Sequence, residues 1–178
     1  MVRLFAVVIA LLPLAVWAQP TVPQLPGGYR PEFKEDAPWE EQKAALPFYP
    51  KSENLVKISI DMPTSFEFFV DALSIGVGRD GVVRYTLVAR SSGGSLNVSF
   101  EGIRCAVRER KLYAFGRTDN TWSEARNAQW APIAAVPTSR QHASLADDFF
   151  CSFGAPVKTA EDALKALRAG SYSRAGLR

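Results

Sequence analysis

Histidine, cysteine and methionine are scarce in this chain of 178 residues, which has one histidine, two cysteines and two methionines. A structural zinc site takes four cysteine or histidine ligands, so we predict no metal site, and we also predict no cofactor. The net charge is small too, because lysine and arginine exceed aspartate and glutamate by only three. Such a small excess gives no reason to expect a polyanion as partner, and we predict no binding of nucleic acid.

Long apolar runs are absent after the N-terminus. Arg3 precedes the apolar run 4–16, and Val16 and Ala18 occupy the two positions that a signal peptidase reads. A helix that spans a bilayer needs about 20 apolar residues, and this run is shorter. The pattern therefore predicts a signal peptide over residues 1–18 that is cleaved after Ala18, and no transmembrane segment in the chain that remains.

Export accounts for the two cysteines, Cys105 and Cys151. Disulfides persist in oxidising compartments such as the bacterial periplasm, so we predict one bridge between these residues. The bridge would close a loop of about 45 residues, which the chain-entropy model values at roughly 4 kcal/mol. A bridged sulfur cannot act as a thiolate nucleophile, and we predict no catalytic residue.

Proline and glycine mark off the segment that precedes the predicted domain. Residues 19–35 are rich in both and have no apolar period, which predicts a flexible lead. Residues 36–170 are predicted to form a single domain, and residues 171–178 a disordered tail. At the start of the domain, Pro38 could begin a short helix that ends at Pro47.

The middle of the domain has the pattern of an antiparallel meander. Its strand-like runs are 55–60, 66–78, 79–90, 95–105 and 111–117. Asp80 and Gly81 lie between two of these runs and indicate a hairpin, because a type I′ turn needs the positive φ that both residues tolerate.

Alternation assigns the side chains of these strands to two faces. On one strand Tyr85 and Leu87 lie on an apolar face. On the next strand Val98 lies on an apolar face and Glu101 on a polar face, which Cys105 shares. The predicted sheet thus has one apolar and one mostly polar face, and the bridge from Cys105 would tie the end of its strand to the C-terminal helical segment.

An apolar sheet face needs a cover, and two helices are predicted downstream to supply it. They span residues 138–151 and 158–170, and the second has Thr159 as its N-cap and Gly170 as its stop. The predicted fold class is α+β, an antiparallel β-meander of about four to five strands with the C-terminal helices packed on it.

Arginine is the most distinctive feature of the predicted surface. The basic residues around one turn and on the neighbouring polar strand face are Arg84, Arg90, Arg104, Arg108, Arg110, Lys111 and Arg117. Guanidinium groups suit carboxylates and phosphates, and Trp122 and Trp130 lie in a polar loop that could line a groove for a peptide or sugar. The alternative is a salt-bridged solvated face with tryptophans that anchor the loop.

Two residues keep an enzymatic alternative open. Asp71 interrupts an otherwise apolar strand, and a buried carboxylate must find a partner. His142 is the sole histidine and precedes Cys151 by nine residues. The alternatives to a binding domain are therefore a hydrolase-type enzyme that uses Asp71 or His142, and a purely structural envelope factor.

Several blocks of the chain carry a family resemblance. In order, they are DGVVRYTLVAR, NVSFEGIRC, LYAFGR, TWSEARNAQW, the Cys151 segment and KTAEDALKALRAG. Over roughly residues 36–170 the chain resembles the cryptic-neisserial-protein-like family of exported bacterial envelope proteins, which has no assigned activity.

The resemblance implies a Gram-negative periplasmic location and carries over no catalytic or ligand-binding residue. Members are often regarded as lipoproteins, but no cysteine follows Ala18 here, so we predict no lipid anchor. We therefore predict an exported periplasmic binding or interaction domain whose partner is an unknown envelope protein or an anionic envelope component. The candidate binding residues are the arginines named above with Trp122 and Trp130.

Overall fold

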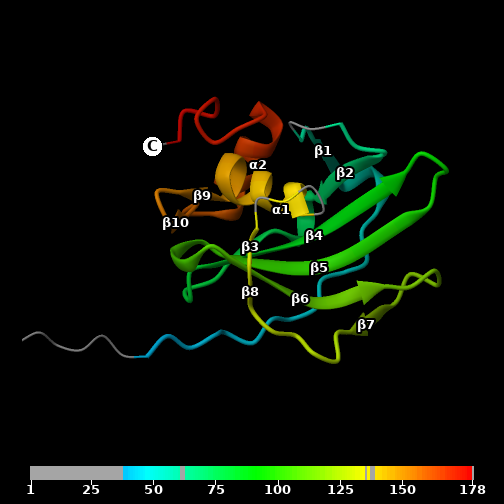
Figure 1. Cartoon of the computed structure of the whole chain (residues 1–178), viewed down its shortest axis with the longest axis horizontal. Coiled ribbons are helices and arrows are strands. Elements are labelled where there is room, and N and C mark those ends of the chain that lie inside the picture. The colour runs from blue at the N-terminus through cyan, green and yellow to red at the C-terminus, as the bar shows by residue number, and fades with distance from the viewer. Residues whose placement is uncertain (1–37, 61–62, 135, 137–138, 178) are drawn as a thin grey trace, which may run out of the picture. The chain divides into compact units, whose positions relative to one another are not determined.

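The structure is a computed structural model that describes residues 38–60, 63–134, 136 and 139–177. The predicted signal peptide and flexible lead lie outside the described residues. Within the described part, eight strands form one antiparallel sheet, and the helices of the C-terminal third lie on one side of it (Figure 1). The predicted α+β class is confirmed, although the sheet has more strands than expected.

The path across the sheet is β1-β2-β4-β5-β6-β7, with β3 paired to β4 and β8 paired to β6. The strands are β1 (Leu55–Ile58), β2 (Phe66–Asp71), β3 (Gly76–Val77), β4 (Val82–Ser91), β5 (Leu96–Arg104), β6 (Glu109–Gly116), β7 (Trp122–Glu124) and β8 (Ala131–Pro132). A short 3₁₀ turn, η1 (Ser52–Asn54), leads into β1.

The strand predicted over 66–78 is interrupted by a 3₁₀ turn, η2 (Ala72–Ser74), and both halves pair with β4. Asp71 ends the first half. Its Oδ1 accepts a hydrogen bond from the Leu73 N–H (3.4 Å), and its carbonyl accepts one from the Ser74 hydroxyl (2.7 Å). The carboxylate that seemed misplaced in an apolar strand therefore caps the turn that breaks it.

The hairpin at Asp80 and Gly81 forms, but with a wider loop than predicted. The Gly78 N–H donates to the Val82 carbonyl (2.9 Å), and of the two predicted turn residues only Gly81 has a positive φ, of 75°. Asp80 keeps ordinary backbone geometry because its carboxylate is engaged on the sheet, where it accepts from the Val82 N–H (3.3 Å) and from other partners described below.

The register between β4 and β5 shows that the prediction of one apolar and one mostly polar sheet face was wrong. Tyr85 lies opposite Glu101, and Leu87 lies opposite Ser99. Directly opposed residues share a face, so the apolar side of β4 meets the side of β5 that was predicted to be polar. Val98 and Val88 form the other face. Both faces of the sheet are therefore partly apolar, and each has its own cover.

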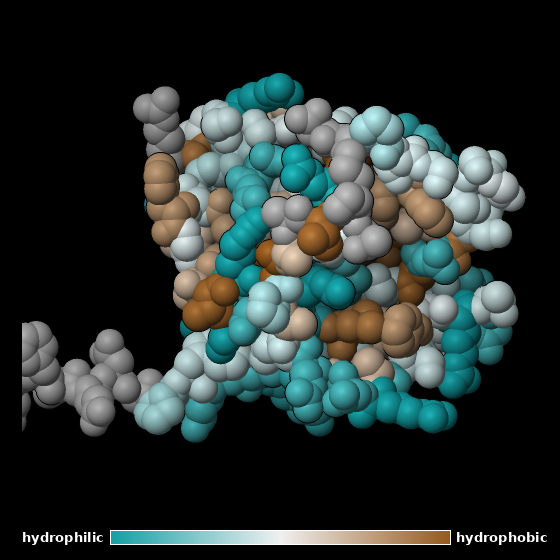
Figure 2. Space-filling view, viewed as in Figure 1, coloured by the Kyte–Doolittle hydropathy of each residue, from teal (hydrophilic) through white to brown (hydrophobic). Residues whose placement is uncertain are grey.

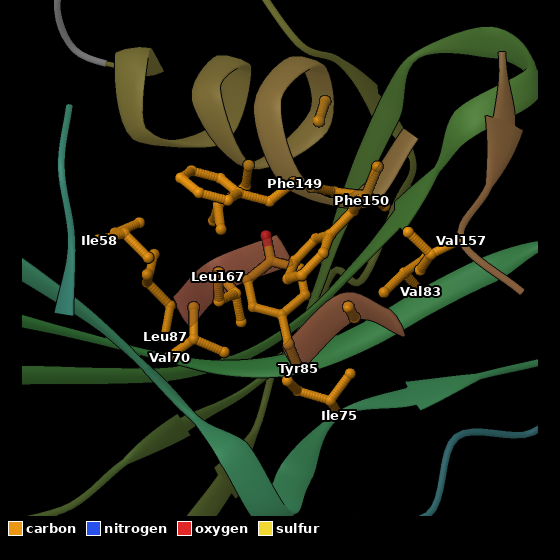
Figure 3. Packing of buried hydrophobic residues seen from close by; sticks show 14 of the residues in the cluster. Ile58, Val70, Ile75, Val83, Tyr85, Leu87, Phe149, Phe150, Val157 and Leu167 are labelled. Carbon is orange, nitrogen blue, oxygen red and sulfur yellow. The ribbon is translucent and has the colours of Figure 1, made fainter. Parts of the chain in front are cut away.

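One cover consists of α1 (Arg140–Ser144), a π-helical continuation η5 (Leu145–Phe150) and α2 (Ala160–Ala169). In Figure 3, Tyr85 extends from the sheet toward these helices beside Phe150, and the two ring centroids are 5.0 Å apart. Phe149 and Leu167 pack into the same buried cluster. The helix predicted over 138–151 is thus two helical pieces, which end at Phe150.

The predicted disulfide is present in the structure. Cys105 Sγ and Cys151 Sγ are 2.02 Å apart, and Cys105 is buried. Cys105 begins a turn, η3 (Cys105–Val107), directly after β5, and Cys151 begins β9 (Cys151–Ser152) directly after η5. β9 pairs with β10 (Ala155–Pro156). The bridge therefore joins the end of a central strand to the helical layer, as predicted.

The second predicted helix is confirmed as α2. The Thr159 hydroxyl oxygen accepts a hydrogen bond from the Asp162 N–H (3.0 Å), and Gly170 ends the helix with φ 83°. Residues 171–177 continue as turns rather than as the predicted disordered tail, because Tyr172 packs against the core and Ala175 is buried.

The other cover of the sheet is the extended segment 38–50, here called the N-terminal strap (blue to cyan in Figure 1). The predicted helix from Pro38 to Pro47 does not form. The Gln42 N–H donates to Asp80 Oδ2 (2.8 Å), and the Gln42 carbonyl accepts from Arg84 (2.8 Å). A backbone that hydrogen-bonds to the sheet in this way is unavailable for helical hydrogen bonds.

Candidate functional site

Four of the predicted binding residues, Arg84, Arg104, Trp122 and Trp130, contact the N-terminal strap. Beneath the strap lies a small apolar cluster of Phe69, Val88 and Val98, against which Tyr49 and Trp122 pack. Tyr49 belongs to the strap, and its hydroxyl donates to the Arg117 carbonyl (3.0 Å). The strap therefore contributes to the fold on this side of the sheet.

Each tryptophan of the described residues helps to attach the strap. The Trp39 indole N–H donates to the Asp80 carbonyl (2.7 Å). The Trp122 indole donates to the Pro47 carbonyl (2.9 Å), and the Trp130 indole donates to Glu41 Oε2 (3.1 Å). These contacts agree with the alternative that the tryptophans anchor the chain.

Two of the predicted arginines, Arg84 and Arg104, also form contacts within the fold. Arg84 forms an ion pair with Asp80 (2.6 Å), and their side chains are only 11% and 1% exposed. Arg104 pairs with Glu109 (2.6 Å), and its guanidinium carbon lies 4.1 Å from the ring centroid of Trp39 and 5.5 Å from that of Trp130. Arginine commonly stacks on aromatic faces in this way.

Glu41 is the centre of the strap contacts. It accepts hydrogen bonds from Lys111 (2.7 Å), Tyr113 (2.8 Å) and Trp130 (3.1 Å). Partial burial raises the pKa of Glu41, but these donors outweigh burial, and the net pKa lies below the usual value. Burial and the bond to Glu41 raise the pKa of Tyr113, which therefore stays a neutral donor.

Of the remaining predicted arginines, three make contacts at the surface, and one, Arg110, has no such contact among the described residues. The surface contacts are Arg90 with Glu67 (3.7 Å), Arg108 with Asp147 (2.8 Å) and Arg117 with Ser123 (3.2 Å). Arg110 lies opposite Ile103 on the helix side of β6 and has no carboxylate partner within the described part of the chain. Binding of a partner by this set stays a prediction.

A cleft lies on the helix side, between α1 and strands β2, β4 and β5, and has a volume of about 630 Å³. Ligand pockets typically measure about 300–1,000 Å³. This helix-side cleft is lined by Ile60, Pro63, Thr64, Ser65, Phe66, Phe68, Leu87, Ala89, Asn97, Ser99, Glu101, Arg140, Gln141 and His142. Most of the side chains that the strands contribute are apolar, whereas α1 contributes three polar ones.

Apolar surface continues beyond this cleft. Phe115 lies opposite Ser99 and Leu112 lies opposite Glu101, so both are on the helix side of β6. Phe115 is 51% exposed. Figure 2 shows hydrophobic side chains gathered at the surface over β5 and β6, below α1. The helical layer therefore leaves part of this sheet face uncovered.

A buried polar group forms one wall of the helix-side cleft. His142 Nε2 lies 2.7 Å from Glu101 Oε2, the Ser99 hydroxyl donates to Glu101 Oε1 (2.6 Å), and the Tyr85 hydroxyl donates to Glu101 Oε2 (3.2 Å). Glu101 is 4% exposed and His142 5%. α1 is thus attached to β5 by a hydrogen-bonded pair as well as by apolar packing.

The surroundings of Glu101 keep it ionised. Burial raises its pKa, but the hydrogen bonds from His142 and Ser99 and the charge of Arg110 outweigh burial, and the net pKa is lowered. Burial and the neighbouring Glu101 raise the pKa of Tyr85, which therefore acts as a neutral donor. Among the described residues, no group hydrogen-bonds to the buried Nδ1 of His142.

The structure does not bring Asp71 and His142 into one cleft. Asp71 lines a separate hollow with Phe48 and Leu73. Burial raises its pKa, although the bond from the Leu73 N–H acts in the opposite direction. The pair that sequence reasoning missed is Glu101 with His142. No local signal could have found it, because 41 residues separate the two.

Within the described ranges, no three His, Cys, Asp or Glu side chains are grouped so that they could hold a metal ion. No helix in that part of the chain has the length and apolar character needed to cross a membrane.

The fold and the cleft define a class: an α+β domain whose disulfide-linked helical layer leaves a ligand-sized cleft on an antiparallel sheet. The chain belongs to the CNP1-like family, whose sequence profile matches residues 34–168. It is similar to cryptic neisserial protein 1 of Neisseria gonorrhoeae (strain ATCC 700825 / FA 1090), with 30% identity over 162 residues that cover 80% of this chain and 79% of the relative. No solved structure matches it.

Proposed function

We propose that this chain is an exported, periplasmic binding domain that holds the apolar part of a ligand in the helix-side cleft. The observation that carries this proposal is the cleft itself, which combines a volume of about 630 Å³ with apolar side chains from β2 and β4. A concave, mostly apolar pocket with a few polar groups is the usual form of a small-molecule site.

The signal-peptide pattern over residues 1–18 supports export. The disulfide between Cys105 and Cys151 is consistent with a compartment outside the cytoplasm. The neisserial relative supports a Gram-negative envelope.

The polar wall of the cleft supports binding rather than chemistry. Glu101 already accepts hydrogen bonds from three neighbours, His142, Ser99 and Tyr85. A carboxylate that is satisfied in this way holds α1 in place and shapes the cleft. Glu101 therefore does not need a hydrogen bond from a substrate to satisfy its carboxylate.

On the strap side, several of the predicted binding residues are already used for contacts within the fold. There Arg84, Trp122 and Trp130 of the predicted binding set already contact the strap. A ligand on that side would have to displace these intramolecular contacts before it gained its own.

A neutral fluorescent probe tests the proposal. We expect N-phenyl-1-naphthylamine to bind the disulfide-bonded protein saturably, at one site. Asn97 is exposed and lines the cleft, so Asn97→Trp should weaken probe binding at least about tenfold by filling the space that the probe needs.

The matched control is Leu96→Trp, which adds a tryptophan to the neighbouring exposed position on the opposite face of β5. It should leave probe binding unchanged. If the probe does not bind, or if both variants weaken binding equally, the cleft is not the site.

A further inference from the structure

We infer that the ligand is an amphipathic anion, a single alkyl or acyl chain that ends in a carboxylate or phosphate, and that Arg140 binds its charged end. This inference rests on the proposed function of the helix-side cleft and specifies the chemical class of the ligand.

The charges that line the cleft favour an anionic ligand. The lining includes two side chains of opposite charge, Arg140 and Glu101, and His142 is hydrogen-bonded to Glu101. Glu101 is buried and compensated by its own hydrogen bonds. Arg140 is half-buried and forms no ion pair with any described carboxylate. The cleft therefore has a positive charge without a partner, which favours an anion.

A second cation reinforces this charge. Arg110 lies on the same side of the sheet and has no carboxylate partner in the part of the chain that the structure describes. Its charge acts on Glu101, whose pKa it helps to lower. In contrast, Arg84, Arg104 and Arg108 are each neutralised by a carboxylate within 2.8 Å. Arg110 thus adds to the positive charge on the side of the sheet that has the cleft.

The positions of Glu101 and Arg140 set the orientation of the ligand in the cleft. An anionic group near Glu101 would be repelled by that ionised carboxylate, so the charged end of the ligand belongs at Arg140. Gln141 and Asn97 also line the cleft and carry amide donors that can add hydrogen bonds. A guanidinium binds either a carboxylate or a phosphate in bidentate geometry.

The apolar walls of the cleft suit an alkyl or acyl chain. Phe66, Phe68, Leu87 and Ala89 line the cleft from adjacent strands. Apolar walls recognise buried length rather than a pattern of polar groups, and each buried methylene should raise affinity about fourfold. A flexible single chain meets this requirement, and chains longer than the cleft should gain nothing further.

The test uses the delipidated, disulfide-bonded protein and displacement of N-phenyl-1-naphthylamine. The competitors are dodecanoate, dodecyl phosphate and dodecanol, each kept below the concentration at which it forms micelles. We expect at least one anion to bind about tenfold more tightly than dodecanol, because a hydrogen bond to a charged group is stronger than one to a neutral group. The better of the two anions identifies the carboxylate or the phosphate as the source of the charge.

Substitution of Arg140 tests its role. Arg140→Gln should reduce anion affinity about tenfold and leave dodecanol and the probe unchanged, whereas Arg140→Lys should reduce it less, because lysine keeps the charge but loses the bidentate geometry. Arg126→Gln is the matched control, since Arg126 is exposed and forms no ion pair with a described residue. It changes the net charge equally and should have no effect.

Failure of this inference is distinct from failure of the proposed function. If the probe binds but dodecanol competes as well as both anions, or if Arg140→Gln and Arg126→Gln behave alike, the ligand is not selected as an anion and the cleft remains a binding site. Loss of anion binding in Arg140→Lys equal to that in Arg140→Gln would also overturn the inference. If the probe itself does not bind, the proposed function fails.

Discussion

The two faces of the sheet are covered by segments of opposite character. On one face the C-terminal helices pack mainly through apolar side chains and are linked covalently to the sheet by the Cys105–Cys151 bridge. On the other face the N-terminal strap has no regular secondary structure and is attached by side-chain hydrogen bonds to residues such as Asp80 and Lys111. The helical cover leaves the cleft, and the strap occupies the groups that could have formed another site.

This difference shows that arginine content alone does not locate a binding site. Arg104 stacks on Trp39 and pairs with Glu109, so its charge is used within the fold. Arg140 lines the cleft and has no such partner among the described residues. The two side chains have the same chemistry, and only their surroundings distinguish an internal contact from a group that can bind a ligand.

Removal of the disulfide, which attaches only the helical cover to the sheet, should have the largest effect on the free energy of unfolding. Cys105→Ala combined with Cys151→Ala should lower the free energy of unfolding by roughly 4 kcal/mol, because the bridge spans a sequence separation of 46 residues and restricts the unfolded chain. Urea unfolding followed by circular dichroism measures the loss. A decrease below about 1 kcal/mol would mean that apolar packing alone holds the helical layer on the sheet.

Glu101→Gln should have the next largest effect, and the effect should depend on pH. The folded-state pKa of Glu101 lies below its ordinary value of 4.5, so the folded protein binds fewer protons there than the unfolded chain does. Its contribution to stability is complete above about pH 4.5 and disappears as the pH falls through the folded-state pKa. At pH 7 we expect the variant to be about 2 kcal/mol less stable than the parent.

Urea midpoints measured between pH 7 and pH 3 check this expectation. The gap between the parent and Glu101→Gln should narrow only in the acidic part of that range. A gap that stays constant down to pH 3 would show that the carboxylate charge contributes nothing beyond hydrogen bonding.

Glu41→Ala should loosen the strap at a smaller cost, of about 1 kcal/mol, because it removes the acceptor for Tyr113 and Trp130 at a half-buried position. The described tryptophans all contact the strap or belong to it, so their emission should shift to the red while the probe still binds in the cleft. The neighbouring exposed Glu40→Ala is the matched control. Equal shifts in both variants would contradict the role assigned to Glu41.

Loss of the ion pair between Arg108 and Asp147 should have the smallest effect on stability, although this pair joins the turn between β5 and β6 to η5. Its side chains are 40% and 56% exposed. A double-mutant cycle with Arg108→Ala and Asp147→Ala should give a coupling of about 0.5 kcal/mol that weakens with added salt. A coupling above about 2 kcal/mol would mean that this pair supports the helical layer as strongly as buried contacts do.

The elements that could be predicted have signals close together in the sequence. Thr159 and Gly170 mark the ends of α2 because capping depends on neighbouring backbone groups. The predicted helix at Pro38 failed because Gln42 bonds to Asp80, 38 residues away. The prediction that the Glu101 side of β5 belongs to the polar face of the sheet was wrong. Alternation shows which residues of one strand share a face, but it does not show which of these faces lies beside the apolar face of the neighbouring strand.

The class of fold, the pairing of the two cysteines and the ends of α2 could be predicted from the amino-acid sequence, since each depends on periodicity, composition or adjacent residues. The side of the sheet on which the helix-side cleft forms could not be predicted, because it depends on strand register and on the packing of the strap. Register brings Glu101 beneath α1, where His142 lies 2.7 Å away, and packing of the strap uses Arg84 and Arg104 while Arg140 keeps an unpaired charge. These outcomes depend on contacts between residues far apart in the chain, and such contacts leave no local signal.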